Sequence, residues 1–98
     1  MLHMVVNTHL PQDCAFRGKE QEEILVGAFE AFEKASIDQE ISLRGSWVNR
    51  SSHEAFVLMD APNAHVIEVA LLEAGLVGRS INRILPVVST DDAIPNEE

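Results

Sequence analysis

Hydrophobic and polar residues follow two different periods along this chain. Apolar residues alternate with polar ones in 41–50, run almost without interruption through 55–59, and occupy both faces of 81–89, while 4–9 is a short β-branched run followed by hydrogen-bonding residues. Alternation with a period of two is typical of a strand with one buried face, and a short apolar run is typical of a strand buried on both faces. We therefore predict four strands in these stretches.

Two further stretches repeat their apolar residues every three or four positions, as an amphipathic helix does. The first covers 19–35, and the second begins within 60–63 and ends at Gly75. Glutamates in the first turn of the first helix suit the positive end of the helix dipole. We expect Asp60 or Asn63 to cap the start of the second helix and Gly75 to cap its end.

The order of these elements is strand, helix, strand, strand, helix, strand, which is the order of the ferredoxin-like α+β fold. Because such crossovers are right-handed, we expect the strand order 4-1-3-2, with all neighbours antiparallel and both helices on one face. Residues 1–90 are expected to form this single domain, and residues 91–98 a flexible acidic tail. Pro86 favours an edge position or a bulge in the last strand.

The face of the sheet that the helices leave open is expected to be apolar as well. In the third strand, Phe56 and Leu58 lie on one face and Val57 and Met59 on the other. At about 25 cal/mol per Å², covering a few hundred Å² of apolar surface stabilises an assembly by several kcal/mol. We therefore expect a second copy of the chain to cover this face in a homodimer.

The element order and the length resemble the dimeric α/β-barrel superfamily, which includes cofactor-free monooxygenases, muconolactone isomerases and small metal-binding proteins. More narrowly, VVNTHLP at 5–11, SWV at 46–48, DAPNA at 60–64 and AGL at 74–76, followed by Ile81, are similar to a family of small stand-alone nickel-binding proteins of that fold. The similarity spans about residues 4–88. It implies a dimeric barrel and a nickel-type divalent metal.

This chain departs from that family at one position that matters for a metal. Family members often carry a histidine in the second helix, one turn before the Ala-Gly-Leu segment, whereas this chain has Val-Ala-Leu-Leu at 69–72. A metal site that uses that histidine is therefore not expected here.

The charge of the chain narrows the range of partners. Sixteen Asp and Glu against seven Lys and Arg give a formal net charge of -9, which opposes binding to the phosphates of nucleic acid. No apolar run approaches the roughly 18 residues of a membrane span, and no signal-peptide pattern opens the sequence. The single cysteine, Cys14, cannot form an internal disulfide. The expected compartment is the cytoplasm.

Histidines at the ends of the strands are the candidate metal ligands. Because the first and third strands are antiparallel, His9 at the end of one lies beside His53 at the start of the other, and Cys14 follows His9 by five residues. Imidazole and thiolate are ligands that suit divalent nickel or zinc. The sequence therefore predicts a metal site of His9, Cys14 and His53. The alternative is that the histidines are solvated and Cys14 is a small buried apolar group.

A second cluster is expected at the opposite end of the sheet, where His3 approaches the end of the third strand and the start of the second helix. Asp60 and His65 lie there. Carboxylate and imidazole also suit a divalent metal. Asp60 and His65 serve equally well as ordinary residues of a helix N-terminus, which is the alternative for this cluster.

A different hypothesis places the chemistry in the space between two sheets. Side chains alternate along the first strand, so that Met4 and Val6 lie on one face and Asn7 and His9 on the other. If Met4 and Val6 face the helices, Asn7 and His9 face the second copy of the chain. The polar side of this strand then lines a cavity within the dimer.

In that arrangement Trp47, Met59 and Arg83 can line the same cavity as Asn7 and His9. An apolar pocket with a few polar groups suits a small aromatic or lactone substrate, and a neutral His9 suits a general base. The alternative is that Asn7 bonds to the main chain and Trp47 belongs to the dimer core. Three functions thus stay open: a metal-binding homodimer, a cofactor-free monooxygenase or isomerase, and a non-enzymatic structural or partner-binding dimer.

Overall fold

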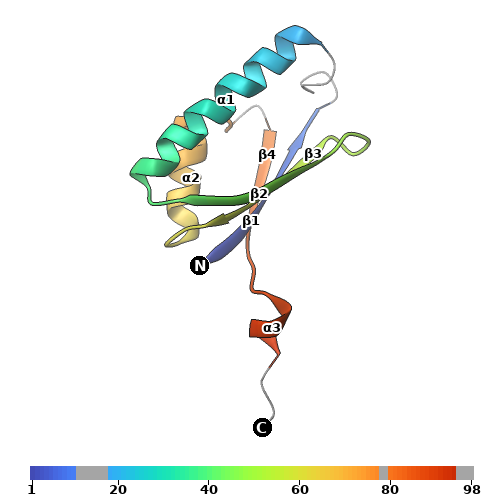
Figure 1. Ribbon diagram of the computed structural model, residues 1–98. Helices are drawn as coiled ribbons and strands as arrows, with labels where there is room; N and C mark the ends of the chain where they lie inside the picture. Colours follow the sequence, from blue (N-terminus) through green and yellow to red (C-terminus); the bar gives the residue numbers. More distant parts are fainter. Residues whose placement is uncertain (11–17, 78–79, 95–98) are drawn as a thin grey trace.

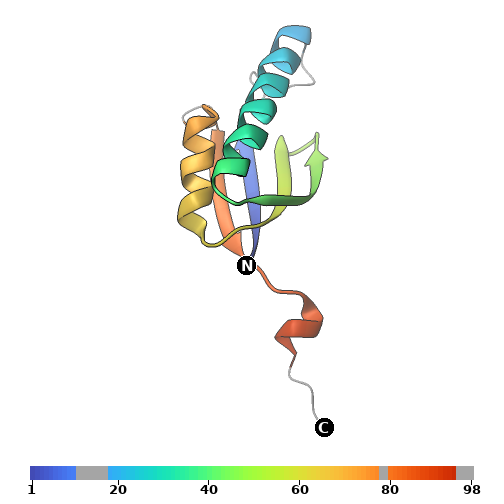
Figure 2. The ribbon, with the colours of Figure 1, turned by 60° about the vertical axis from the view of Figure 1, so that its left-hand side comes forward.

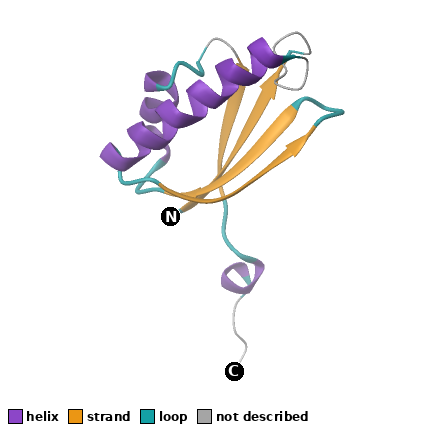
Figure 3. Cartoon of the chain, turned by 45° about the horizontal axis from the view of Figure 1, so that its top comes forward, coloured by secondary structure: helices purple, strands orange, loops and turns teal. Residues whose placement is uncertain are grey.

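The protein folds as a single four-stranded sheet covered on one face by two helices (Figures 1 and 3). The computed structural model describes residues 1–10, 18–77 and 80–94. The elements are β1 (Leu2–His9), α1 (Lys19–Asp38), β2 (Ser42–Asn49), β3 (Glu54–Asp60), α2 (Ala64–Glu73), β4 (Ser80–Pro86) and α3 (Thr90–Ala93). The strands lie in the order β2-β3-β1-β4, and all neighbours are antiparallel. The predicted ferredoxin-like α+β fold and its strand order are confirmed.

α1 continues three residues beyond its predicted end, to Asp38. Within this extension the Ser36 hydroxyl donates to the Phe32 carbonyl at 2.7 Å. The chain then turns through Glu40 at φ 59°, and the N–H of Ile41 donates back to the Ser36 carbonyl at 2.9 Å. Neither α1 nor any other helix in the described ranges is long and apolar enough to cross a membrane.

The residues that cap α2 are among those predicted from the sequence. Asn63, rather than Asp60, caps the start, because its side-chain oxygen accepts from the Val66 N–H at 3.0 Å. Gly75 follows the end of the helix at φ 75°, a left-handed conformation that glycine adopts without a Cβ penalty. Its N–H donates to the Leu72 carbonyl at 3.1 Å.

The hydrophobic core lies between the sheet and the two helices. Ile67 and Ala70 of α2 are completely buried, and Met59 of β3 is 1% exposed. Nine buried residues form this cluster: Val5, Phe32, Ala35, Ile41, Met59, Ala61, Ile67, Ala70 and Leu71. The core therefore ties β1 and β3, the two central strands, to both helices.

The two faces of β1 are the reverse of those assumed for the cavity hypothesis. Val5 packs in the core beneath the helices, so the odd-numbered side chains from His3 to His9 lie on the helix side of the sheet. Met4 and Val6 point to the other side. Alternation along a strand separates two sets of side chains, but it does not say which set faces the helices when both sets contain apolar residues.

We call the side of the sheet away from α1 and α2 the open sheet face (Figure 3). Cross-strand pairing and alternation place on it Met4, Val6, Trp47, Phe56, Leu58, Ile81, Arg83 and Leu85. Trp47 is 56% exposed and Ile81 is 70% exposed. This surface is therefore mostly apolar, with Arg83 as its basic side chain.

The chain leaves the sheet after β4 and runs away from the body of the molecule (Figures 1 and 2). The Val87 N–H still donates to the Leu2 carbonyl at 3.0 Å. Beyond it, the Ser89 hydroxyl accepts from the Asp92 N–H at 3.2 Å and caps α3. This short helix lies partly within the expected flexible tail 91–98 and was not predicted. Residues 95–98 lie outside the described part of the chain.

Candidate functional site

His9 and His53 lie side by side at one end of the sheet, as the antiparallel pairing of β1 and β3 predicts. The backbone N–H of His9 donates to the His53 carbonyl at 3.1 Å. The centres of the two imidazole rings are 5.6 Å apart, and the ring planes meet at 74°. Two of the three predicted metal ligands are therefore neighbours.

His53 is held in an unusual conformation in the turn that joins β2 and β3. Its φ is 55°, which few residues other than glycine adopt. The turn is fixed by Asn49, whose side-chain oxygen accepts from the backbone N–H groups of Ser51 and Ser52 at 3.0 and 3.2 Å. The turn presents the His53 ring to His9.

The Nδ1 atom of His53 is buried, and no described residue forms a hydrogen bond with it. Leaving a buried polar atom without a partner costs about 1–3 kcal/mol. A neutral imidazole offers one nitrogen with a free electron pair, which can bind a proton donor or a metal ion. The His53 ring therefore has a buried nitrogen suited to a ligand.

The spacing of the two rings fits adjacent ligands of one ion. With metal–nitrogen distances of about 2.1 Å, two imidazoles on a tetrahedral ion have ring centres roughly 5 Å apart. The observed 5.6 Å is close to this value. The predicted third ligand, Cys14, lies outside the described residues, and within them no three His, Cys, Asp or Glu side chains form a group that could hold a metal ion.

A network of polar side chains links β1 to β4 next to this histidine pair. The Asn7 side-chain NH₂ donates both to Ser80 Oγ and to Asn82 Oδ1, each at 2.7 Å. The Ser80 hydroxyl donates to the Leu76 carbonyl at 3.2 Å, and Ser80 is the β4 partner of His9 in the sheet. Ser80 and Asn82 were not singled out from the sequence. The position of Asn7 in this network gives it a structural role, although its partners are side chains rather than the main chain.

A small cavity of about 60 Å³ lies beside this network, between the two helices and the sheet. Asn7 and Asn82 are its polar lining residues, and Val5, Phe29 and Phe32 belong to its apolar wall. A cavity that holds benzene measures about 150 Å³. This space is too small for an aromatic substrate, and it lies on the helix side rather than between two sheets.

The residues proposed to line a catalytic cavity do not share one side of the sheet. Asn7 and His9 lie on the helix side, and Met59 is buried there in the core. Trp47 and Arg83 lie on the open sheet face. The sheet therefore lies between Asn7 and His9 on one side and Trp47 and Arg83 on the other. This is because β1 has the reverse orientation to the one assumed for the cavity.

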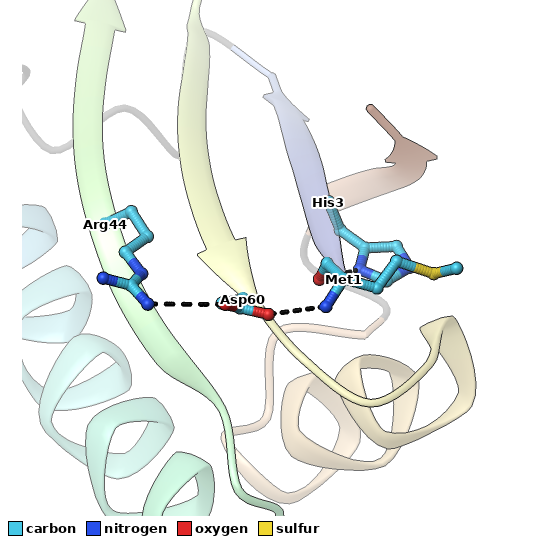
Figure 4. Close-up of polar contacts among 4 residues, drawn as sticks. All are labelled: Met1, His3, Arg44 and Asp60. Carbon is cyan, nitrogen blue, oxygen red and sulfur yellow. Dashed lines mark hydrogen bonds and ion pairs between the residues drawn. The ribbon is translucent and has the colours of Figure 1, made fainter. Parts of the chain in front are cut away.

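The second predicted cluster does not form a metal-binding group within the described residues, and Figure 4 shows the contacts of its members His3 and Asp60. Asp60 accepts from the Met1 amino group at 2.7 Å and from Arg44 at 3.3 Å, and the Met1 amino group and then Arg44 lower the pKa of this carboxyl group. His3 is 1% exposed, and its Nδ1 lies 3.1 Å from the Met1 carbonyl. The His65 side chain is 80% exposed on α2. His3 and Asp60 thus both contact Met1, whereas the exposed His65 lies 3.9 Å from Glu68 on α2.

Comparison with known proteins supports the fold. No protein-family model and no curated protein matches this chain. Among solved structures, the crystal structure of SCO4226 from Streptomyces coelicolor A3(2) is similar, with a TM-score of 0.59 and 16% sequence identity over 89% of this chain and 99% of that one. At this level of identity the likeness shows a related fold and says nothing about function.

Proposed function

We propose that this chain is a homodimeric binding protein for a divalent transition-metal ion of the nickel type, held by His9 and His53. The observation that supports this most directly is the ring contact between these two histidines at 5.6 Å. It brings together two side chains of a type that can bind metal, one at the end of β1 and one in the turn before β3, which are far apart in sequence. The buried Nδ1 of His53 adds a nitrogen that lacks a partner among the described residues.

The proposed ligand chemistry is that of a borderline-soft metal. Neutral imidazole suits nickel, copper and zinc, and a thiolate completes such a set. We propose Cys14 as the third ligand because it follows His9 by five residues in the sequence. The choice of nickel rests on the resemblance of VVNTHLP at 5–11 and DAPNA at 60–64 to small nickel-binding proteins.

The proposed dimer is supported by the apolar open sheet face. Trp47, Ile81 and Leu85 are 56%, 70% and 41% exposed there. At about 25 cal/mol per Å², covering these side chains in both copies stabilises an assembly by several kcal/mol. Association of two copies through this face would cover these side chains and leave the helices outside.

Metal titration with matched histidine variants tests the site. Nickel at ~100 μM should raise the melting temperature of the wild-type protein, because a ligand that binds only the folded state stabilises it. His9→Ala and His53→Ala should each weaken nickel binding by about 10-fold or more in isothermal titration calorimetry. His65→Ala is the control, because this exposed histidine lies outside the pair. The His65→Ala variant should bind nickel with the affinity of the wild type.

Two outcomes would contradict the proposed site. One is the absence of any rise in melting temperature with nickel, zinc or copper. The other is unchanged affinity in the double variant of His9 and His53. Cys14→Ser tests the third ligand separately, because a thiolate bound to nickel gives a near-ultraviolet charge-transfer band that serine does not give.

A further inference from the structure

The segment after β4 carries apolar side chains that are largely exposed. We call residues 87–94 the C-terminal arm. Val88 and Ile94 are 68% and 62% exposed, and no residue of α3 is buried. Figures 1 and 2 show the arm extending away from the sheet and from both longer helices. The arm thus has two exposed aliphatic side chains that are available to contact another molecule.

The helix in this arm is too short to be stable without a partner. α3 comprises four residues, Thr90–Ala93, whereas isolated helices shorter than about 12 residues are marginal in water. The Ser89 cap satisfies only part of the free backbone groups at its start. Packing against another molecule would therefore stabilise this single turn.

The open sheet face offers a complementary surface. Arg83 is exposed on it and lies opposite Val6 in the sheet. No ion pair joins Arg83 to another residue in the described ranges. A guanidinium that is covered by a second molecule needs an anion beside it. The arm carries Asp91 and Asp92 together with Val88 and Ile94, so it brings both the missing charge and apolar contacts.

The arm is also long enough to cross the sheet. From Pro86, three extended residues and the four-residue helix span roughly 16 Å. Four strands at about 4.8 Å spacing make a sheet roughly 14 Å wide. The arm leaves the edge strand β4 at the end where Val87 still bonds to Leu2, so it starts at the margin of the open sheet face.

We propose that the C-terminal arm of each copy packs across the open sheet face of the other copy, with Asp91 and Asp92 against Arg83 of the partner subunit. This inference rests on the homodimer proposed above and specifies what fastens it. The occupant is a second copy of this chain because it supplies the acidic and apolar residues that the surface requires.

Charge reversal tests the ionic part of this contact. Arg83→Glu should raise the dimer dissociation constant more than 10-fold in sedimentation equilibrium, and the double variant Asp91→Lys with Asp92→Lys should do the same. Combining all three changes should return the constant to within about threefold of the wild type, because the charges are again opposite. Lys34→Glu is the matched control, since this exposed lysine lies on α1, and it should leave the constant unchanged.

Polar substitution tests the apolar part. Val88→Asp and Ile94→Asp should each raise the dissociation constant more than 10-fold, whereas Ile37→Asp, at a 79% exposed position on α1, should not. A wild-type protein that stays monomeric would overturn the homodimer and the arm together. A wild-type dimer that none of the arm variants weakens would overturn the arm alone. Loss of monomer stability without any change in dimerisation would place the arm on its own sheet and would also overturn the proposal.

Discussion

Replacing Trp47 by alanine should break the homodimer and leave the fold of each chain intact. The indole is 56% exposed on the open sheet face, so the monomer depends little on it. The ring lies directly over Gly45, because a Cβ at that position would stand only 2.9 Å from Trp47 Cη2. The glycine thus lets the ring lie flat on the sheet, which fixes a large apolar surface before any partner binds.

The size of the effect follows from the area that the partner would cover. A tryptophan side chain presents about 250 Å², and the exposed part, 56%, is therefore roughly 140 Å². At 25 cal/mol per Å² its burial contributes about 3.5 kcal/mol per copy, or about 7 kcal/mol per dimer. If only half of this is realised, the loss of about 3.5 kcal/mol raises the dissociation constant roughly 300-fold.

Sedimentation equilibrium measures this constant, and far-ultraviolet circular dichroism checks that the variant is folded. Gly45→Ala should weaken the dimer by a smaller factor, because the added methyl group pushes the Trp47 ring aside. Leu72→Ala is the control: this residue is 65% exposed on α2 and its removal should not change the constant. The fluorescence of the single tryptophan also reports on dimerisation, since its emission should shift to shorter wavelengths as the concentration of the wild-type protein rises. An unchanged constant in Trp47→Ala, with the ring still solvated in the wild-type dimer, would refute this reasoning.

Three further predictions concern the stability of the fold. Asn7→Ala removes two hydrogen bonds of 2.7 Å and should lower the free energy of unfolding in urea by about 1–3 kcal/mol. Gly75→Ala should lower it by about 1 kcal/mol, because φ is 75° and an added Cβ meets nothing within 4 Å, so the cost is conformational. The pKa of Asp60 is lowered from the ordinary carboxyl value of 3.8, so the ionised side chain stabilises the fold at pH values above 3.8. This stabilisation is lost as the pH falls through the lowered pKa. Asp60→Asn should therefore melt at a lower temperature than the wild type near neutral pH, and the difference should disappear in acid.

The sequence was sufficient to predict the sheet because its signals were local and agreed with one another. The turn-and-cap residues Asn63 and Gly75 marked α2, and the order of the elements allowed few topologies. The neighbouring positions of His9 and His53 followed from that topology alone. α3 escaped prediction because a single helical turn is too short to show a period.

The orientation of β1 could not be predicted from the sequence for a different reason. Val5 and Val6 are adjacent and chemically identical, and only the packing of Val5 against the core distinguishes the two faces. His3 lies on the same side as Val5 and is 1% exposed, although a histidine is rarely buried to this extent. The network of Asn7, Ser80 and Asn82 could have been found by aligning the polar positions of β4 with Asn7 in the antiparallel register.

The sheet lies between the histidine pair and the open sheet face. The proposed metal site and the proposed dimer contact can therefore be tested with separate variants. His9 lies on the helix side, whereas Trp47 lies on the opposite side. If all ligands come from one chain, Trp47→Ala should bind nickel with wild-type affinity and His53→Ala should dimerise with the wild-type constant. If Cys14 of the partner subunit completes the site instead, metal and dimer must stabilise each other reciprocally. Nickel would then lower the dissociation constant by the same factor by which dimerisation raises nickel affinity, and Trp47→Ala would weaken both.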